Sequence, residues 1–222
     1  LIWSAPGVGK SMLSLSLALA VGGGGSCLGW QSPAPRKVLL VDGEQHIQDI
    51  HDRAKMLMQT IEGIDAGEAG KNVTILARQD QDPCSEFPDL AEEEGRDKIF
   101  RRAMSSKIDM IILDNFSTLA TVEDENAASA FNPIITFLLQ MKQAGIATIL
   151  GHHSNKTGKD FRGSSKLATT FEVILGLQRP TSNEHKFGTA FDLEWTKYRQ
   201  KREDTLRGRS VWLEEDPDGA IS

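Results

Sequence analysis

The sequence predicts an α/β fold in which helices cover both faces of a mostly parallel, twisted sheet. Short apolar runs of the kind that parallel sheets bury recur at 37–42, 73–77, 110–115 and 147–151. Segments with apolar residues at helical spacing lie between these runs, and such alternation is typical of a parallel sheet. Because ligands of these sheets bind beyond the carboxyl ends of the strands, polar residues that follow the runs are candidates for a site.

Length and composition limit the class of protein. At 222 residues the chain fits one large domain, and we expect a single domain over residues 1–222. Residue 1 already lies in the first expected strand and is not methionine, so we expect an N-terminal flank to be missing. Two cysteines without zinc-site spacing favour a cytoplasmic location. No apolar run reaches the roughly 18 residues that a membrane helix needs, so we expect no membrane partner. The net charge of −6 argues against an all-over nucleic-acid coat.

The stretch 4–11 predicts a phosphate-binding loop. It lies between apolar residues 1–3, which predict a strand, and the leucine-rich run 12–21, which predicts a helix. The pattern G-x-x-x-x-G-K-[ST] is matched at its last three positions, whereas Ser4 stands where the pattern has glycine. This departure matters only if the backbone at Ser4 must adopt a positive φ, which serine tolerates poorly.

The residue types of this loop suit a nucleoside triphosphate with Mg²⁺. Glycines lack a Cβ, so successive N–H groups can turn inward around phosphate oxygens at the positive end of the following helix. Lys10 would reach the β and γ phosphates, and Ser11 would give its hydroxyl to Mg²⁺. The residues expected to contact the nucleotide are Ala5, Pro6, Gly7, Val8, Gly9, Lys10, Ser11 and Met12.

A secretory signal is the alternative interpretation of the same stretch. Lys10, the apolar run 12–21 and the small residues 22–26 superficially match its basic, apolar and small-residue regions. The two interpretations differ at Lys10, because a signal is cleaved whereas a nucleotide site needs the lysine. The leucines of this run alternate as in a strand, yet on a helix they spread round most of the circumference, as expected for a buried helix.

The remaining elements follow in order. A glycine and proline stretch at 22–35 delays the strand expected at 37–42. Apolar residues at helical spacing then predict a helix over 47–61, before the strand at 73–77. Residues 80–97 hold eight carboxylates against one arginine, which indicates a solvated loop. Further expected elements are helices at 97–106 and 131–143 and strands at 110–115 and 147–151.

Asp114 and Glu44 complete the predicted site. Asp114 ends an apolar strand, where phosphate-loop enzymes place an aspartate beside the metal; an aspartate that caps a turn is the alternative. Asn115 follows it, so this strand cannot also supply a base. A carboxylate after the 37–42 strand would orient and deprotonate the water that attacks the γ-phosphate. We favour Glu44 over Asp42, which still lies in the strand, and a plain turn carboxylate is the alternative.

These motifs resemble the RecA-like P-loop ATPases, and most of all their RepA-type hexameric replicative helicase branch. The resemblance rests on residues 6–11, 41–44, 113–115 and 152–153 in this order, and it covers residues 1–213. It implies the RecA-like P-loop NTPase fold, ATP as the substrate, Mg²⁺, and Glu44 as the base. It also implies that a polar residue at a strand end senses the γ-phosphate. His153 matches that position best and His152 second, while the alternative is that both are surface or core residues.

The resemblance gives a meaning to two basic segments. In RecA-like rings the loop after this strand lines the central channel, so Lys156, Lys159 and Arg162 would contact single-stranded DNA. The alternative is a basic surface loop. Residues 193–199 resemble the strand that sends a Lys-x-Arg pair into the neighbouring subunit's nucleotide site. Lys197 and Arg199 form this pair here, and Arg199 is the better candidate for the finger.

Two functions remain open from the sequence. The first is an ATP-hydrolysing motor that acts on DNA in replication or recombination and self-associates into a ring, a hexamer by resemblance. The second is an ATP-dependent regulatory switch that assembles on ATP and has a protein partner. Salt-sensitive retention on single-stranded DNA would favour the first, and ATP-driven assembly without such retention would favour the second.

Overall fold

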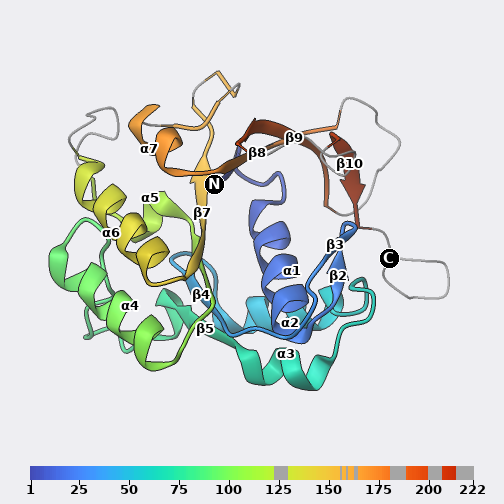
Figure 1. Ribbon diagram of the computed structural model, residues 1–222, viewed down its shortest axis with the longest axis horizontal. Helices are drawn as coiled ribbons and strands as arrows, with labels where there is room; N and C mark the ends of the chain where they lie inside the picture. Colours follow the sequence, from blue (N-terminus) through green and yellow to red (C-terminus); the bar gives the residue numbers. More distant parts are fainter. Residues whose placement is uncertain are drawn as a thin grey trace.

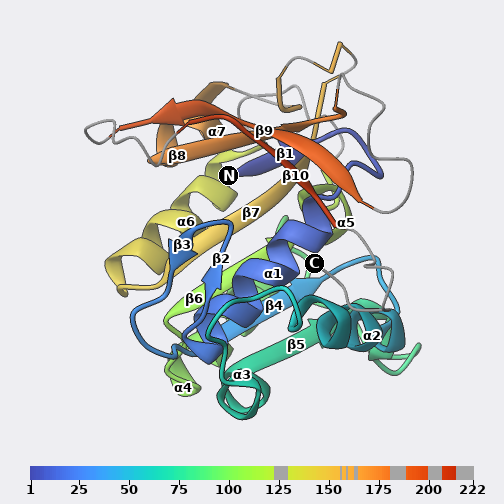
Figure 2. The ribbon, with the colours of Figure 1, turned by 90° about the vertical axis from the view of Figure 1, so that its right-hand side faces the viewer.

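An eight-stranded sheet runs through the molecule. The computed structural model describes residues 1–122, 130–155, 157–158, 160–162, 165–180, 189–199 and 207–213. Within these residues the strand order is β10-β9-β8-β1-β7-β6-β4-β5 (Figures 1 and 2). The strands β8, β1, β7, β6, β4 and β5 are parallel to one another. Strand β9 is antiparallel to β8, and β10 is antiparallel to β9. The strands of this sheet are β1 (Ile2–Ser4), β4 (Val38–Asp42), β5 (Val73–Ala77), β6 (Met110–Asp114), β7 (Ala147–His153), β8 (Val173–Gln178), β9 (Ala190–Tyr198) and β10 (Arg209–Trp212).

Helices pack on both faces of this sheet. Figure 1 shows α4 and α6 on one side of β7 and α1 with α3 on the other. In Figure 2 the side that carries α1 and α3 faces the viewer. This arrangement confirms the predicted α/β class. The helices are α1 (Lys10–Gly23), α2 (Ile47–Leu57), α3 (Ala66–Asn72), the 3-10 turn η1 (Arg78–Asp80), α4 (Glu93–Ser105), α5 (Phe116–Leu119), α6 (Asn132–Gln143) and α7 (Ser165–Thr170).

The central strands are buried on both faces, which explains their continuous apolar runs. All five residues of β4 and all five of β6 are buried. Alternate residues of β4 point to opposite sides: Leu39 and Val41 join the core under α4 and α6, whereas Val38 and Leu40 join the core under α1 and α2. The sheet therefore separates two apolar layers.

Helix α1 is a core helix. Its residues Leu13, Leu15 and Leu19 are buried, which agrees with the expected spread of apolar residues round its circumference. Across the described ranges, none of the helices combines the length and the apolar character that crossing a bilayer requires.

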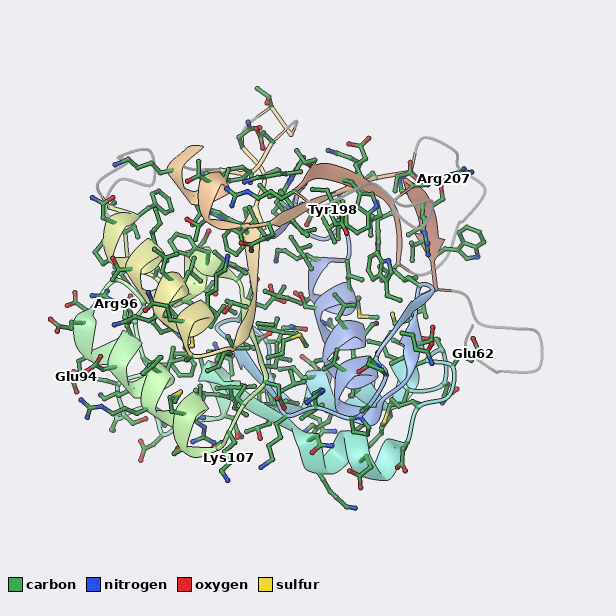
Figure 3. The ribbon with its side chains drawn as sticks, in the orientation of Figure 1. Glu62, Glu94, Arg96, Lys107, Tyr198 and Arg207 are labelled. Carbon is green, nitrogen blue, oxygen red and sulfur yellow. The ribbon has the colours of Figure 1, made fainter. Side chains whose placement is uncertain are left out.

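Several boundaries differ from those predicted. The helix expected from residue 97 begins at Glu93, because two acids in its first turn lie at the positive end of the helix dipole. One of them, Glu94, labelled in Figure 3, also pairs with Lys98 at 2.8 Å. The helix expected to reach residue 61 ends at Leu57 and is followed by turns. The elements that the sequence did not predict are α3, η1, α5, α7, β8, β10 and the hairpin of β2 (Ser26–Cys27) and β3 (Trp30–Gln31).

Two helical glycines provide a test of this packing. A Cβ on Gly95 of α4 would lie 2.0 Å from the backbone oxygen of Asp89, so Gly95→Ala must displace the backbone. A Cβ on Gly70 of α3 would meet nothing within 4 Å. We expect Gly95→Ala to lower the free energy of unfolding by about 1–3 kcal/mol, and Gly70→Ala to raise it by up to about 1 kcal/mol. Chemical denaturation measures both, and equal effects would contradict the described contact.

Candidate functional site

The phosphate loop joins the end of β1 to the start of α1. Gly7 and Gly9 have φ values of 73° and 129°, in the region that favours glycine. A Cβ on Gly9 would also lie 2.7 Å from Thr189 and 2.8 Å from Phe191, where β9 begins. Among the described residues, Leu28 and Lys107 are the non-glycine residues with positive φ, so Ser4 departs from the pattern without a conformational cost.

The first turn of α1 is suited to an anion. Gly9 is its N-cap, and in the described structure no side chain caps the helix and no acid lies in its first turn. The amide groups and the positive dipole end are therefore directed at the loop. Ser11 and Met12 lie in this turn, while Val8 is buried and Pro6 is exposed. These nucleotide-contact candidates thus lie together in the loop and in the first turn of α1.

Lys10 and Asp114 form a buried ion pair. Lys10 Nζ lies 3.0 Å from Asp114 Oδ1, and the two side chains are 7% and 3% exposed. Gly151 of β7 makes room for them, because a Cβ there would lie 2.6 Å from Asp114 Oδ1 and 3.3 Å from Lys10 Cδ. The pair joins the start of α1 to the end of β6.

Asp42 organises the turn that carries Glu44. Asp42 is buried opposite Asp114 in the register of β4 and β6. Its carboxylate accepts from the N–H groups of Glu44 at 2.8 Å and Gln45 at 2.6 Å, and from Gln45 Nε2 at 2.7 Å. Burial raises the pKa of Asp42, and these hydrogen bonds oppose that rise. The carboxylate of Asp42 is thus engaged in the turn, whereas Glu44 is exposed, which supports the choice of Glu44 as the base.

Glu44 contacts the end of the neighbouring strand. Asn115 Nδ2 donates to Glu44 Oε2 at 2.8 Å. The strand tips that carry Asp42 and Asp114 therefore bring a buried ion pair and an exposed, hydrogen-bonded carboxylate to one edge of the sheet. This edge lies at the carboxyl ends of the strands, as predicted.

The two adjacent histidines face opposite sides of the sheet. His152 is buried against the rings of Phe116 and Phe161, at centroid distances of 4.9 and 6.4 Å. His152 is therefore a core residue of the helical layer that contains α5 and α6. Because strand residues alternate in direction, His153 lies on the face of Gly151 and Lys10. This placement supports His153 over His152 as the γ-phosphate sensor.

The predicted finger residues lie at the opposite edge of the sheet. Strand β1 leads into the phosphate loop, and β8 runs parallel to it, so the carboxyl end of β8 lies on the side of the phosphate loop. Tyr198, labelled in Figure 3, pairs with Val173 at the other end of β8, where that strand begins. Lys197 Nζ donates to the carbonyl of Ala168, and Arg199 Nη2 donates to the carbonyl of Thr169 at 2.6 Å. Partial burial and the nearby Arg199 guanidinium lower the pKa of Lys197. The pair therefore does not reach the nucleotide site of its own chain.

The candidate DNA loop is anchored next to His153. Arg162 N donates to the carbonyl of His153 at 2.8 Å, and Ser154 forms an isolated antiparallel β-bridge with Phe161. Lys156 and Lys159, the other two predicted DNA contacts, lie outside the described residues. The base of the loop thus rises from the carboxyl end of β7.

A family comparison identifies the chain. The family model described as "AAA domain" matches residues 1–159. The chain belongs to the AAA domain family. Its fold is shared with the crystal structure of the KaiC-like protein PH0186 from the hyperthermophilic archaeon Pyrococcus horikoshii OT3, with a TM-score of 0.65 and 15% sequence identity. The match covers 99% of this chain and 86% of that chain. No curated protein sequence matches the chain.

The AAA domain is therefore a P-loop ATPase of RecA-like fold. Sequence reasoning missed three residues that shape its site. Gly151 and Gly43 admit neighbouring side chains where a Cβ would clash, and the sequence showed them only as glycines beside the predicted acids and histidines. Asn115 was noted only as a residue that is not an acid, although its amide contacts Glu44.

Burial of His152 makes the stability of the AAA domain depend on pH. Burial, with positive charge from His153, Lys10 and Arg162, lowers the pKa of His152 from 6.5 to about 3. Because the folded pKa lies below the unfolded one, the stability is full above pH 6.5 and falls as the pH falls toward 3. From pH 7 to pH 5 this residue should cost about 2 kcal/mol of unfolding free energy.

His152→Asn tests this assignment, because its Oδ1 can replace Nδ1 as the acceptor for the N–H of His153. We expect the variant to be less stable at pH 7 but to lose about 2 kcal/mol less than the unmodified chain between pH 7 and pH 5. Urea denaturation at both pH values measures the difference. Parallel pH dependences of the two proteins would contradict the assignment.

Proposed function

We propose that this AAA domain hydrolyses ATP with Lys10, Asp114 and Glu44 around the triphosphate. The observation that carries the proposal is the meeting of these groups, remote in sequence, at one edge of the sheet. Lys10 pairs with Asp114 at 3.0 Å, and Glu44, two residues after the end of β4, contacts Asn115, the residue that follows Asp114. Lys10 would neutralise phosphate charge, and Glu44 would take a proton from the attacking water.

The residues present fit Mg²⁺ as the metal of this reaction. Ser11 and Asp114 offer hard oxygen donors, which Mg²⁺ prefers. In the described residues no group of three or more His, Cys, Asp or Glu side chains could hold a metal, so phosphate oxygens and waters must complete the shell, as is usual for Mg²⁺. When bound, the ion supplies charge neutralisation for the phosphates.

Two variants separate binding from hydrolysis. Lys10→Ala should abolish measurable ATP binding, because it removes the cation at the β and γ phosphates. Glu44→Gln should bind ATP with unchanged affinity but lower kcat by about a hundredfold or more, because it removes the base. Calorimetric titration with a non-hydrolysable analogue and a phosphate-release assay measure the two effects, with thermal unfolding as the folding control. Normal turnover by Glu44→Gln would remove Glu44 as the base.

We further propose that the domain belongs to the RepA-type branch and works as a hexameric ring on single-stranded DNA. Lys197 and Arg199 lie at the edge of the sheet opposite their own phosphate loop. A role at a γ-phosphate therefore requires a second copy of the chain, which supports self-association. The basic loop begins beside His153, so one strand end carries both the sensor candidate and the DNA loop.

DNA dependence tests the motor proposal. Single-stranded DNA should raise the ATPase rate several-fold, and the triple variant Lys156→Ala, Lys159→Ala, Arg162→Ala should abolish that rise, because it removes the phosphate contacts. A matched triple variant of exposed cations on α4, at Lys98, Arg101 and Arg102, removes the same charge and should keep the rise. No stimulation of the unmodified chain would count against DNA as the partner.

The second candidate is an ATP-dependent regulatory switch with a protein partner. The net charge of −6 argues against an all-over nucleic-acid coat, which is compatible with this candidate. Mass measurement with and without ATP, together with salt-dependent retention on single-stranded DNA, distinguishes the two. Assembly on ATP without retention would favour the switch.

A further inference from the structure

The amide of Asn115 holds the carboxylate of Glu44. Asn115 Nδ2 donates to Glu44 Oε2 at 2.8 Å across 71 residues of sequence. Asn115 is 2% exposed, whereas Glu44 is exposed. A buried, fixed donor therefore restrains a side chain that solvent would otherwise leave to rotate freely.

Helix α5 fixes which way this amide points. Asn115 is the N-cap of α5, and its Oδ1 accepts from the N–H of Thr118 at 3.3 Å. Because a backbone N–H can only donate, the amide oxygen must face Thr118, and the NH₂ group must then face Glu44. The Asn115 amide thus caps α5 with its oxygen and contacts Glu44 with its nitrogen.

The turn that carries Glu44 is interlocked with the same helix. Gly43 N donates to the carbonyl of Asp114 at 3.0 Å. A Cβ on Gly43 would lie 2.4 Å from Thr118 Oγ1, so the turn packs directly on α5. The main chain of Glu44 is also held by Asp42. The protein itself therefore presets both the backbone and the carboxylate of Glu44.

We propose that Asn115 is a positioning residue for the hydrolysis reaction, which sets the Glu44 carboxylate for the attacking water. This inference rests on the proposed function of Glu44. A general base must lie within hydrogen-bond reach of the proton that it takes, and a misplacement of about 1 Å can cost about a hundredfold in rate. Because Asn115 contacts Glu44 rather than the phosphate loop, its loss should change turnover and leave nucleotide affinity unchanged.

Asn115→Ser and Asn115→Asp test the inference, because each keeps an oxygen that can cap α5. Serine is too short to reach Glu44, and aspartate replaces the donor by an acceptor of like charge. We expect Asn115→Ser to lower kcat by about ten- to a hundredfold, with KM, the Kd of a non-hydrolysable ATP analogue and Tm unchanged. Asn115→Asp should lower kcat further, because its carboxylate repels that of Glu44.

A double-mutant cycle with Glu44→Gln supplies a readout that a merely structural role would not move. We expect Asn115→Ser to leave the residual rate of Glu44→Gln unchanged, since the restrained carboxylate is already gone. An unchanged or raised kcat in Asn115→Ser, a matching loss of affinity, or an undiminished effect in the Glu44→Gln background would overturn the inference. Normal turnover by Glu44→Gln would overturn the proposed base as well, which keeps the two failures apart.

Discussion

The buried ion pair between Lys10 and Asp114 is the interaction on which the site depends. Each charge is nearly removed from water, so each needs the other, and deletion of one partner of such a pair typically costs about 3–5 kcal/mol. The pair links the first turn of α1 to the tip of β6, two elements that are 104 residues apart. It exists only because Gly151 leaves space above it. Together with β1, which pairs with β7 and β8 and leads directly into the loop, this contact ties the phosphate loop to the sheet.

The ends of β4 and β6, next to that pair, carry polar residues with different roles. β4 ends in Asp42, which is hydrogen-bonded within its own turn, and Glu44, two residues further along, is exposed. β6 ends in the buried Asp114, and Asn115, which follows it, donates to the glutamate. Because these strands are parallel and adjacent, a difference of one or two residues along each strand decides whether a side chain lies in the core or at the open edge.

The sequence was most informative where burial alone decides the structure. Residues 73–77 were expected as a strand and form β5 with the same bounds, and the runs that became β4 and β6 were found because both their faces are covered. The short helices α5 and α7 were missed, because four to six residues carry too little periodic signal. Strand β8 was missed although its six residues form a largely apolar run like those of β4 and β6. In the site, Lys10, Glu44 and Asp114 follow from motif spacing, and the structure brings them to one edge. The contact of Asn115 with Glu44 could not be predicted, since it depends on the register of two strands and on the cap of α5.

Strand β9 connects two distant places in the domain. It begins where Thr189 and Phe191 press against Gly9 of the phosphate loop, and it ends at the strand terminus that carries Lys197 and Arg199. Its nine residues span about 30 Å in extended conformation. Among the described residues, β9 pairs with β10 from Ala190 to Leu193 and with β8 from Asp192 to Tyr198, so hydrogen bonds hold it from one end to the other. One strand therefore fixes the distance, within a single subunit, between the residues that contact Gly9 of the phosphate loop and the end of the sheet that carries Lys197.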